Sequence, residues 1–333
     1  MKHTTIPDIA KKLNLSPSTV SRALSNHPAI KDETKARVRK AAKELGYTPN
    51  LLALGLKKNQ TRTIGVIVPL IKNDFFSSAI SGIEQVAYQS GLTILLCQSN
   101  EEYDTEVVNA RLLMDHRVAG LIVAISQKTR TCAHFQEFLN RKIPVVFFDR
   151  FCEDIAASKV LVDDRKGAFD AVTHLIERGY RRIAHFAGPQ HLAPFSGRLK
   201  GYIDALDEHQ IPVENRSVRW GGVEEEDGYK AMDSLLKDNV VPDAIFAVND
   251  PVGIGAFRRI REASLHIPES IAIIAYGNTR ISELLDPPLS TVNQPSVEMG
   301  KTSARILIDT INHKVTEPVT VVLDTKLIVR KST

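Results

Sequence analysis

Apolar residues recur at helical spacing in three short segments of the first 45 residues. The first segment, "TIPDIAKKLN", carries the elements of a capping box, because Thr5 can cap a helix and Asp8 stands three residues later. The second, "SPSTVSRALSN", begins with Ser16, a good N-cap, followed by Pro17 at the first helical position. The third begins at Asp32 and ends before a glycine. We predict three helices that share one small core, formed by Ile6, Ile9, Ala10, Leu13, Val20, Ala23, Leu24, Ala36, Val38, Ala41, Ala42 and Leu45.

A different pattern begins at Thr63, where short apolar segments alternate with amphipathic stretches. The apolar segments are "TIGVIVP", "LTILLCQS", "GLIVAI", "PVVFFD", "KVLVDD", "RIAHFAG", "AIFAVN" and "IAIIAYG". Strands that are apolar throughout and separated by helices are typical of parallel sheets covered on both faces. These strands are too numerous for the single sheet of one doubly wound domain. We therefore predict an α/β body of two similar lobes, with a ligand site in the cleft between them at the carboxyl ends of strands.

The first two predicted helices are separated only by a tight turn, which is the arrangement of a helix-turn-helix. The second helix of such a unit enters the major groove with its N-terminal residues at base edges, so we expect Pro17, Ser18 and Arg22 at the DNA. Thr19 and Ser21 suit phosphate oxygens, since short hydroxyls near a helix start fix the register of a protein on DNA. The alternative is a helical hairpin with a polar surface.

Charge is distributed unevenly along the chain. The net charge is +4, yet residues 1–60 contain 12 Lys and Arg against 4 Asp and Glu, whereas the remainder contains 31 against 35. This asymmetry indicates that the first segment meets a polyanion and that the rest is an ordinary soluble body. A solvated charged surface without a partner would give the same count.

Composition and cysteine usage limit the other classes of protein. A chain of 333 residues with 43% hydrophobic content suggests two or three globular domains. Cys97, Cys132 and Cys152 are widely spaced, without a CxxC motif or a His pair at ligand spacing, so we expect reduced, packed thiols and no zinc site. The first residues lack a signal-peptide pattern, and no apolar run is long enough to cross a membrane. A cytoplasmic protein without a membrane partner is expected.

The segment "TIPDIAKKLNLSPSTVSRALSNHPAIKDETKARVRKAAKELGYTPN" resembles, without a gap, the headpiece of the lactose/galactose repressor (LacI/GalR) family of bacterial transcription regulators. The resemblance continues through "LLALGLKKNQT", where that family has a linker that folds into a helix on operator DNA. It implies that Leu56 is a wedge in the minor groove and that Ala53 allows close approach. Without the family, these leucines could form a short buried helix. The predicted DNA-binding set is Thr5, Ser16, Pro17, Ser18, Thr19, Ser21, Arg22, Asn26, Ala53 and Leu56.

The resemblance extends more loosely over the remaining residues and implies a core of the periplasmic-binding-protein type. It gives a helix-turn-helix domain at 1–49, a hinge helix or linker at 50–61, and an effector-binding and dimerisation core at 62–333, with an N-lobe of about 62–161 and 292–321 and a C-lobe of about 162–291 and 322–333. The segments "VPLIKNDFF", "FFDR", "RLKGY", "AVNDPVGIGA" and "LSTVNQP" stand where the family has its strand-end motifs. They imply an effector site formed by Asn73, Phe75, Phe76, Asp149, Arg150, Arg198, Asn249 and Asp250.

Several of these residues also have structural interpretations. Arg198 and Asp250 could hold hydroxyls or charge through charge-assisted hydrogen bonds. Alternatively, Asp250 could be a helix N-cap, Phe76 could belong to the core, and Asp149 and Arg150 could pair with each other.

One departure from the family affects the expected ligand. In "IAYGN", Gly277 replaces the aspartate that family members usually have. Loss of a carboxylate while Arg150 and Arg198 remain predicts a positively charged cleft and an anionic effector, such as a sugar acid or a sugar phosphate. A neutral sugar is the alternative.

We interpret the chain as a dimeric, sequence-specific transcriptional regulator, a repressor of carbohydrate-utilisation genes. It would bind a palindromic operator in double-stranded DNA under allosteric control by a sugar or sugar-acid effector. No metal or catalytic residue is predicted. No cofactor is predicted either, because "VGIGAFRRI" has Arg258 where a dinucleotide fingerprint needs Gly or Ala, so this segment is better explained by helix packing. The alternative function is a sugar-binding or sugar-modifying α/β protein with an accessory headpiece. Inducer and co-repressor, and dimer and tetramer, remain open.

Overall fold

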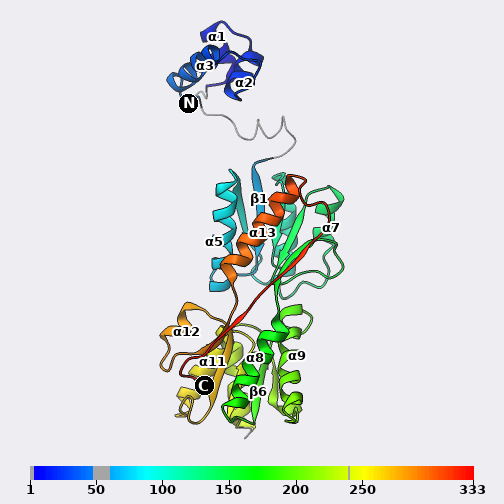
Figure 1. Ribbon diagram of the computed structural model, residues 1–333, viewed down its shortest axis with the longest axis vertical. Coiled ribbons are helices and arrows are strands. Elements are labelled where there is room, and N and C mark those ends of the chain that lie inside the picture. The colour runs from blue at the N-terminus through cyan, green and yellow to red at the C-terminus, as the bar shows by residue number, and fades with distance from the viewer. Residues whose placement is uncertain (1–3, 48–60, 239–240) are drawn as a thin grey trace. The chain divides into compact units, whose positions relative to one another are not determined.

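The computed structural model describes residues 4–47, 61–238 and 241–333, and the chain divides into two compact units, Met1–Thr61 and Arg62–Thr333 (Figure 1). The described residues of the first unit, 4–47 and Thr61, form three helices, α1 (Ile6–Leu13), α2 (Pro17–Leu24) and α3 (Asp32–Glu44). Their shared core is the one predicted, with Ile6, Leu13, Leu24 and Leu45 only partly buried at its margin, except that Ala36 is exposed. The second unit consists of two lobes, each built on one six-stranded sheet.

The capping signals of the first unit work as the sequence predicts. The Asp8 carboxylate accepts hydrogen bonds from the backbone N–H of Thr5 at 2.8 Å and from its hydroxyl at 2.6 Å. The Ser16 hydroxyl accepts from the backbone N–H of Thr19 at 3.1 Å and so starts α2. Between the two helices, Asn14 adopts a left-handed conformation, which ends α1 and turns the chain.

The N-lobe is a parallel sheet with helices on both faces. Its strands, in spatial order, are β11 (Thr320–Leu323), β5 (Ser158–Val162), β4 (Val145–Phe148), β3 (Leu121–Val123), β1 (Thr63–Val68) and β2 (Thr93–Gln98). The covering helices are α5 (Asp74–Gln89), α6 (Tyr103–Asp115), α7 (Ala133–Asn140) and α13 (Ser296–Ile311). Buried residues of α5 and α13 share one apolar cluster, and those of α6 and α7 belong to another.

The C-lobe repeats this architecture. Its strands, in spatial order, are β12 (Lys326–Ile328), β10 (Ser290–Asn293), β9 (Ala272–Gly277), β8 (Ala244–Ala247), β6 (Ile183–Ala187) and β7 (Val218–Trp220). All pairings are parallel except that of β10 with β12. The helices are α8 (Asp164–Glu177), α9 (Ala193–Glu208), α10 (Glu225–Lys237), α11 (Asp250–Glu262) and α12 (Arg280–Leu284), with a 3-10 turn at Asn215–Ser217.

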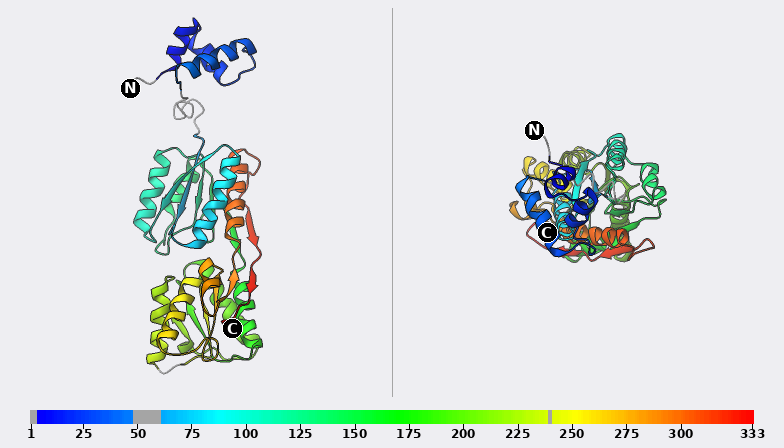
Figure 2. Two further views of the ribbon diagram at one scale, coloured as in Figure 1. Left: turned by 90° about the vertical axis from the view of Figure 1, so that its left-hand side faces the viewer. Right: turned by 90° about the horizontal axis from the view of Figure 1, so that it is seen from above.

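The chain passes between the two sheets three times, after β5, after β10 and after β11. Figure 2 shows the last of these connections running along one side of both lobes. Because β4 and β8 both end near these connections, the polar segments that follow them lie at the junction of the lobes. The fold therefore brings strand ends from both lobes to one cleft.

Gly255 of "VGIGAFRRI" and Gly228 of α10 serve helix packing, whereas Gly253 faces Ala275 of β9. A Cβ on Gly255 would lie 1.8 Å from the Glu225 carbonyl oxygen, and one on Gly228 would lie 1.9 Å from the Val252 carbonyl oxygen. The two glycines therefore let α10 and α11 approach backbone to backbone, which agrees with the packing interpretation of this segment.

The cysteine prediction is wrong for two of the three residues. Cys132 and Cys152 form a disulfide, whereas Cys97 is free and half-buried. The two bonded residues are 20 positions apart and separated by α7 and β4, so sequence spacing gave no sign that the fold brings them together.

Candidate functional site

Hydroxyl groups gather at the N-terminus of α2 in the first unit. The Ser16 Oγ lies 2.8 Å from both the Ser18 Oγ and the Thr19 Oγ1. Ser16, Pro17 and Ser18 are exposed, while Thr19 is half-buried. An exposed helix start with short hydroxyls is the kind of surface that contacts phosphates and base edges.

The other predicted DNA-contact residues occupy different places. Arg22 is exposed in the last turn of α2, and Ser21 is half-buried. Asn26 is exposed in a left-handed conformation, and its Oδ1 accepts from Arg39 Nη2 at 3.1 Å. Thr5 caps α1. Ala53 and Leu56 lie outside the residues that the structure describes.

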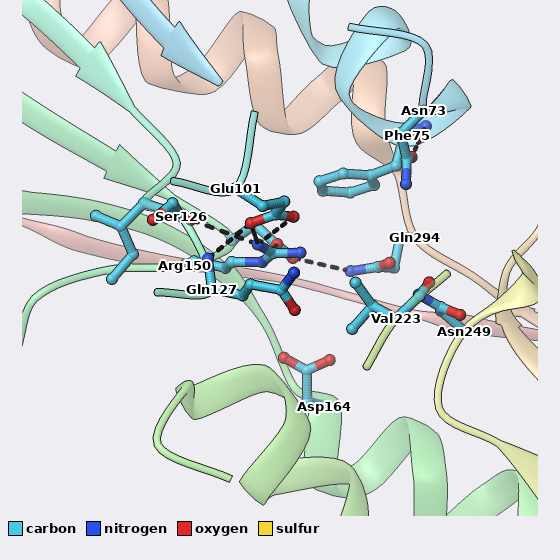
Figure 3. A network of polar contacts seen from close by, with 12 residues as sticks. Asn73, Phe75, Glu101, Ser126, Gln127, Arg150, Asp164, Val223, Asn249 and Gln294 are labelled. Carbon is cyan, nitrogen blue, oxygen red and sulfur yellow. Dashed lines mark hydrogen bonds and ion pairs between the residues drawn. The ribbon is translucent and has the colours of Figure 1, made fainter. Parts of the chain in front are cut away.

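In the second unit, Arg150 lies at the centre of the cleft and is held by Glu101 (Figure 3). Its Nη1 donates to both carboxylate oxygens of Glu101 at 2.9 Å, and its guanidinium lies 5.6 Å from the ring of Phe76 and 5.3 Å from that of Phe195. Only 4% of Arg150 is exposed. The Glu101 carboxylate also accepts from the Gln127 backbone N–H at 2.6 Å, so it connects the segments that follow three strands.

Asp149 lies beside this pair, but Glu101 makes the shorter contact with Arg150. Its carboxylate is 3.8 Å from Arg150 Nε and accepts from Gln294 Nε2 at 3.4 Å. Burial raises the pKa of Asp149, although the charges of Arg150 and Arg198 oppose the shift. The mutual ion pair predicted for positions 149 and 150 is thus the weaker of the contacts that Arg150 makes.

Arg198 forms the corresponding pair in the C-lobe. Its guanidinium is 2.8 Å from Asp164 Oδ1, donates to the Val248 carbonyl at 2.7 Å and lies 3.8 Å from the centre of the Tyr276 ring. Burial raises the pKa of Asp164 to about 6, with Arg198 acting in the opposite direction. Only 2% of Arg198 is exposed, so it is anchored before any ligand arrives.

Asn249 and Asp250 open α11 in two different roles. Asn249 is the N-cap: its Oδ1 accepts from the Val252 backbone N–H at 2.9 Å, and its Nδ2 donates to the Val223 carbonyl at 2.8 Å. Asp250 is fully buried, and its carboxylate accepts three hydrogen bonds of 2.6 Å, from the Thr279 N–H, the Ser282 hydroxyl and the Thr291 hydroxyl. The N-cap predicted at Asp250 is therefore one residue earlier, and Asp250 fixes the segment after β9.

The N-lobe wall is formed by the start of α5. Asn73 caps this helix by accepting from the Phe75 backbone N–H at 3.0 Å, and Figure 3 shows the Phe75 ring facing the cleft beside it. Phe76 is 2% exposed and packs against Phe148, as in its core interpretation. A cavity of about 430 Å³ lies between this helix and the segment after β9, and its lining is Asp74, Phe75, Ser78, Gly277, Asn278, Thr279, Arg280, Glu283 and Ser296.

The two arginines that led to the prediction of an anionic effector have carboxylate partners within the protein. Both arginines are already paired with carboxylates, and the carboxylates around them outnumber the guanidinium groups. The acidic groups are Glu101, Asp149, Asp164 and Asp250, against Arg150 and Arg198.

Sequence reasoning missed the residues that pair with the predicted set. Glu101, Gln127 and Asp164 stand within four residues of the ends of β2, β3 and β5, so a search of all strand ends would have found them, whereas Asp149 and Asn249 were placed by the family resemblance. Gln294 follows β10 in the quoted segment "LSTVNQP" but was not selected.

Two further findings limit the chemistry of the described residues. Within 4–47, 61–238 and 241–333, no three His, Cys, Asp or Glu side chains are placed to hold a metal ion. The same parts of the chain contain no helix long and apolar enough to cross a membrane.

Comparison with known proteins agrees with both units. Residues 5–50 match the bacterial regulatory proteins of the lacI family, and residues 172–333 match the periplasmic binding protein-like domain. The HTH-type transcriptional repressor PurR of Vibrio atlanticus (strain LGP32) is 35% identical over 312 residues, which cover 93% of this chain and 92% of the relative. Relatives of this kind are repressors and not enzymes.

Two solved structures resemble the whole chain. The transcriptional regulator CelR in complex with cellobiose is 30% identical, with a TM-score of 0.77 over 99% of this chain and 100% of that one. The lac repressor dimer bound to operator and the anti-inducer ONPF is 26% identical, with a TM-score of 0.87 over 99% of both chains.

A helix-turn-helix headpiece joined to a two-lobed core with a ligand cleft defines a DNA-binding transcriptional regulator that responds to small molecules. The chain belongs to the lacI family of bacterial regulatory proteins.

Proposed function

We propose that this regulator is a homodimeric repressor that binds a palindromic operator and is controlled by a neutral, hydroxyl-rich ligand of the sugar class. We assign operator reading to residues 1–49, a hinge to 50–61, and ligand binding and dimerisation to 62–333. Its site of action is the bacterial cytoplasm, where operator DNA lies.

The proposal for DNA reading rests on the exposed start of α2. Arg22 has the geometry to donate two hydrogen bonds to a guanine, and no ion pair with a described residue restrains it. One headpiece reads too few bases for specificity, whereas two related by a twofold axis read a palindrome. The related lac repressor structure is a dimer bound to operator, which supports the same arrangement.

An apolar surface on the N-lobe supports dimerisation. β2 is an edge strand, and Leu96 on it is 37% exposed. Val108 and Leu112 lie one helical turn apart on the adjacent α6 and are 64% and 47% exposed. Large apolar residues clustered on an edge strand and its neighbouring helix are favourable for a self-complementary interface.

The single observation that carries the ligand class is the internal pairing of Arg150 and Arg198. A sugar hydroxyl can accept from a guanidinium edge and donate to the paired carboxylate at the same time, so the pair binds a neutral polyol without losing its own contact. Phe75 provides a flat apolar surface against which a sugar ring can stack. The related CelR structure contains cellobiose, a neutral sugar.

Thermal melting of the full-length protein against a panel of neutral sugars, sugar acids, sugar phosphates and nucleosides tests this proposal. A ligand at about 100 times its Kd adds roughly 2.7 kcal/mol to the free energy of unfolding. For a core of this size, that raises the melting temperature by about 5 °C. We expect a rise with a neutral sugar. A rise with sugar acids or phosphates alone contradicts the ligand class, and a nucleoside response would assign the cleft to a different one.

A further inference from the structure

The disulfide joins two loops that line the N-lobe half of the cleft. Cys132 ends the loop after β3, and Cys152 lies in the loop after β4, with their Cα atoms 6.3 Å apart. Cys152 is only 5% exposed, whereas Cys132 is half-buried at the start of α7. The bond therefore adds a covalent link between two loops that are otherwise joined by hydrogen bonds, among them the one from the Ile125 N–H to the Arg150 carbonyl at 3.4 Å.

The opposite ends of these loops carry the groups of the cleft. Gln127, in the first loop, donates its N–H to Glu101, and Arg150, in the second, donates to the same carboxylate (Figure 3). Ser126 donates its N–H to the buried Glu106 at 2.7 Å. A change in the spacing of the loops would move the two donors of Glu101 relative to each other.

The first loop also meets the C-lobe. The Gln127 carbonyl oxygen lies 2.7 Å from His191 Nε2, on the segment after β6. Gln127 thus contacts Glu101 through its N–H and the other lobe through its carbonyl. The position of this loop therefore affects both the ion pair of Arg150 with Glu101 and the contact between the lobes at His191.

We propose that Cys132 and Cys152 form a reversible thiol–disulfide site that controls how firmly the loops after β3 and β4 are held at the cleft. The inference rests on the proposed function only in that the cleft is taken as the ligand site. Bacterial cytoplasm keeps most thiols reduced, so the bond would form under oxidising conditions and open when reducing thiols return. The closed bond holds Gln127 and Arg150 in the positions in which both donate to Glu101, and so preorganises the cleft for ligand. Opening the bond lets the two loops move apart.

The chemistry is thiol–disulfide exchange with a small thiol. A glutathione thiolate attacks Cys132 Sγ, the more accessible sulfur, and Cys152 leaves as a thiolate that takes up a proton. A second glutathione thiolate attacks the mixed disulfide and releases Cys132, which is also protonated. Two glutathiones are oxidised to one glutathione disulfide, and one protein disulfide becomes two thiols. Oxidation by glutathione disulfide is the reverse sequence.

Hydrogen exchange of the full-length protein, oxidised or treated with excess reduced glutathione, is the test. Thiol titration in denaturant should find one thiol in the oxidised chain, Cys97, and three after reduction. We expect exchange of the Ser126 and Gln127 amides to rise by about tenfold or more on reduction. The Val252 amide, which donates to Asn249 in the C-lobe, should not change.

Variants separate this site from a merely structural bond. The double substitution Cys132→Ser and Cys152→Ser should show the fast exchange with or without glutathione, and Cys97→Ser should respond as the native chain does. If the double variant does not fold, the native chain with and without glutathione still decides the question. The proposal is overturned if glutathione leaves the bond closed, if the Ser126 and Gln127 amides are unaffected by opening, or if exchange rises uniformly across both lobes. This readout needs neither operator nor ligand, so its failure is distinct from failure of the proposed function.

Discussion

Replacing Glu101 by Gln should destabilise the core far more than the same replacement at its neighbour Glu102. The Glu101 carboxylate is the bidentate partner of Arg150, and both side chains are less than a tenth exposed. Removing the charge of one partner of a buried ion pair costs about 3 to 5 kcal/mol, because the other charge is left uncompensated. Glu102 pairs with Lys128 at 2.6 Å, but both side chains are at least half exposed, so that pair contributes about 0 to 1 kcal/mol.

The measurement is calorimetric melting of the full-length variants at pH 7. At about 2 °C per kcal/mol for a core of this size, Glu101→Gln should lower its melting temperature by about 6 to 10 °C, and Glu102→Gln by no more than about 2 °C. Sulfate, compared with chloride at equal ionic strength, should raise the melting temperature more in the Glu101 variant than in the Glu102 variant, because Arg150 then keeps only the longer contact with Asp149, at 3.8 Å. Equal small losses in both variants would refute the argument that Arg150 depends on Glu101.

Three further perturbations test the headpiece, the C-lobe core and the packing of α10 on α11. Arg22→Ala should relax base preference in a selection from random duplexes and weaken binding to the site that the native protein selects by about 1 to 3 kcal/mol. Burial lowers the pKa of His185 to about 4, so its neutral form stabilises the fold above pH 6.5, and this stability is lost as pH falls towards 4. Denaturant titrations should show the native chain losing about 3 kcal/mol more than His185→Phe between pH 7 and 4. Gly228→Ala should destabilise by about 1 to 3 kcal/mol through its clash with Val252 in thermal melting, whereas Gly221→Ala, with no atom nearer than 3.8 Å, should not.

Each of these outcomes has a clear opposite. Unchanged base selectivity would remove Arg22 from the reading set. The raised pKa values of Asp149 and Asp164 affect both chains of the pH comparison equally, so parallel pH profiles would mean that His185 is not held neutral. Equal melting of the two glycine variants would contradict the close approach of α10 and α11.

Local signals in the sequence predicted local structure well. The caps at Thr5 and Ser16 and the apolar strands ending before Asp149 and Asn249 depend on residues only a few positions apart. β7 was missed because its three residues, ending in the 64% exposed Trp220, carry no apolar run.

Long-range pairing could not be predicted from the same signals. Arg150 was placed in the cleft, but its partner Glu101 is 49 residues away, and only the order of strands β4, β3, β1 and β2 brings the two together. The disulfide depends on the same arrangement. Consequently the sequence indicated which polar groups lie at the cleft, whereas the partners of these groups became evident only from the contacts between them.

The central claim is that a neutral ligand in the cleft changes how the headpiece binds DNA. The most direct measurement is fluorescence anisotropy of a selected operator duplex titrated with the full-length protein, with and without a saturating amount of the neutral sugar that stabilises it. Ligand and operator affinities coupled through the core should change operator Kd by about fivefold or more, while the corresponding sugar acid should leave it unchanged. The same operator Kd with and without the sugar would contradict the account.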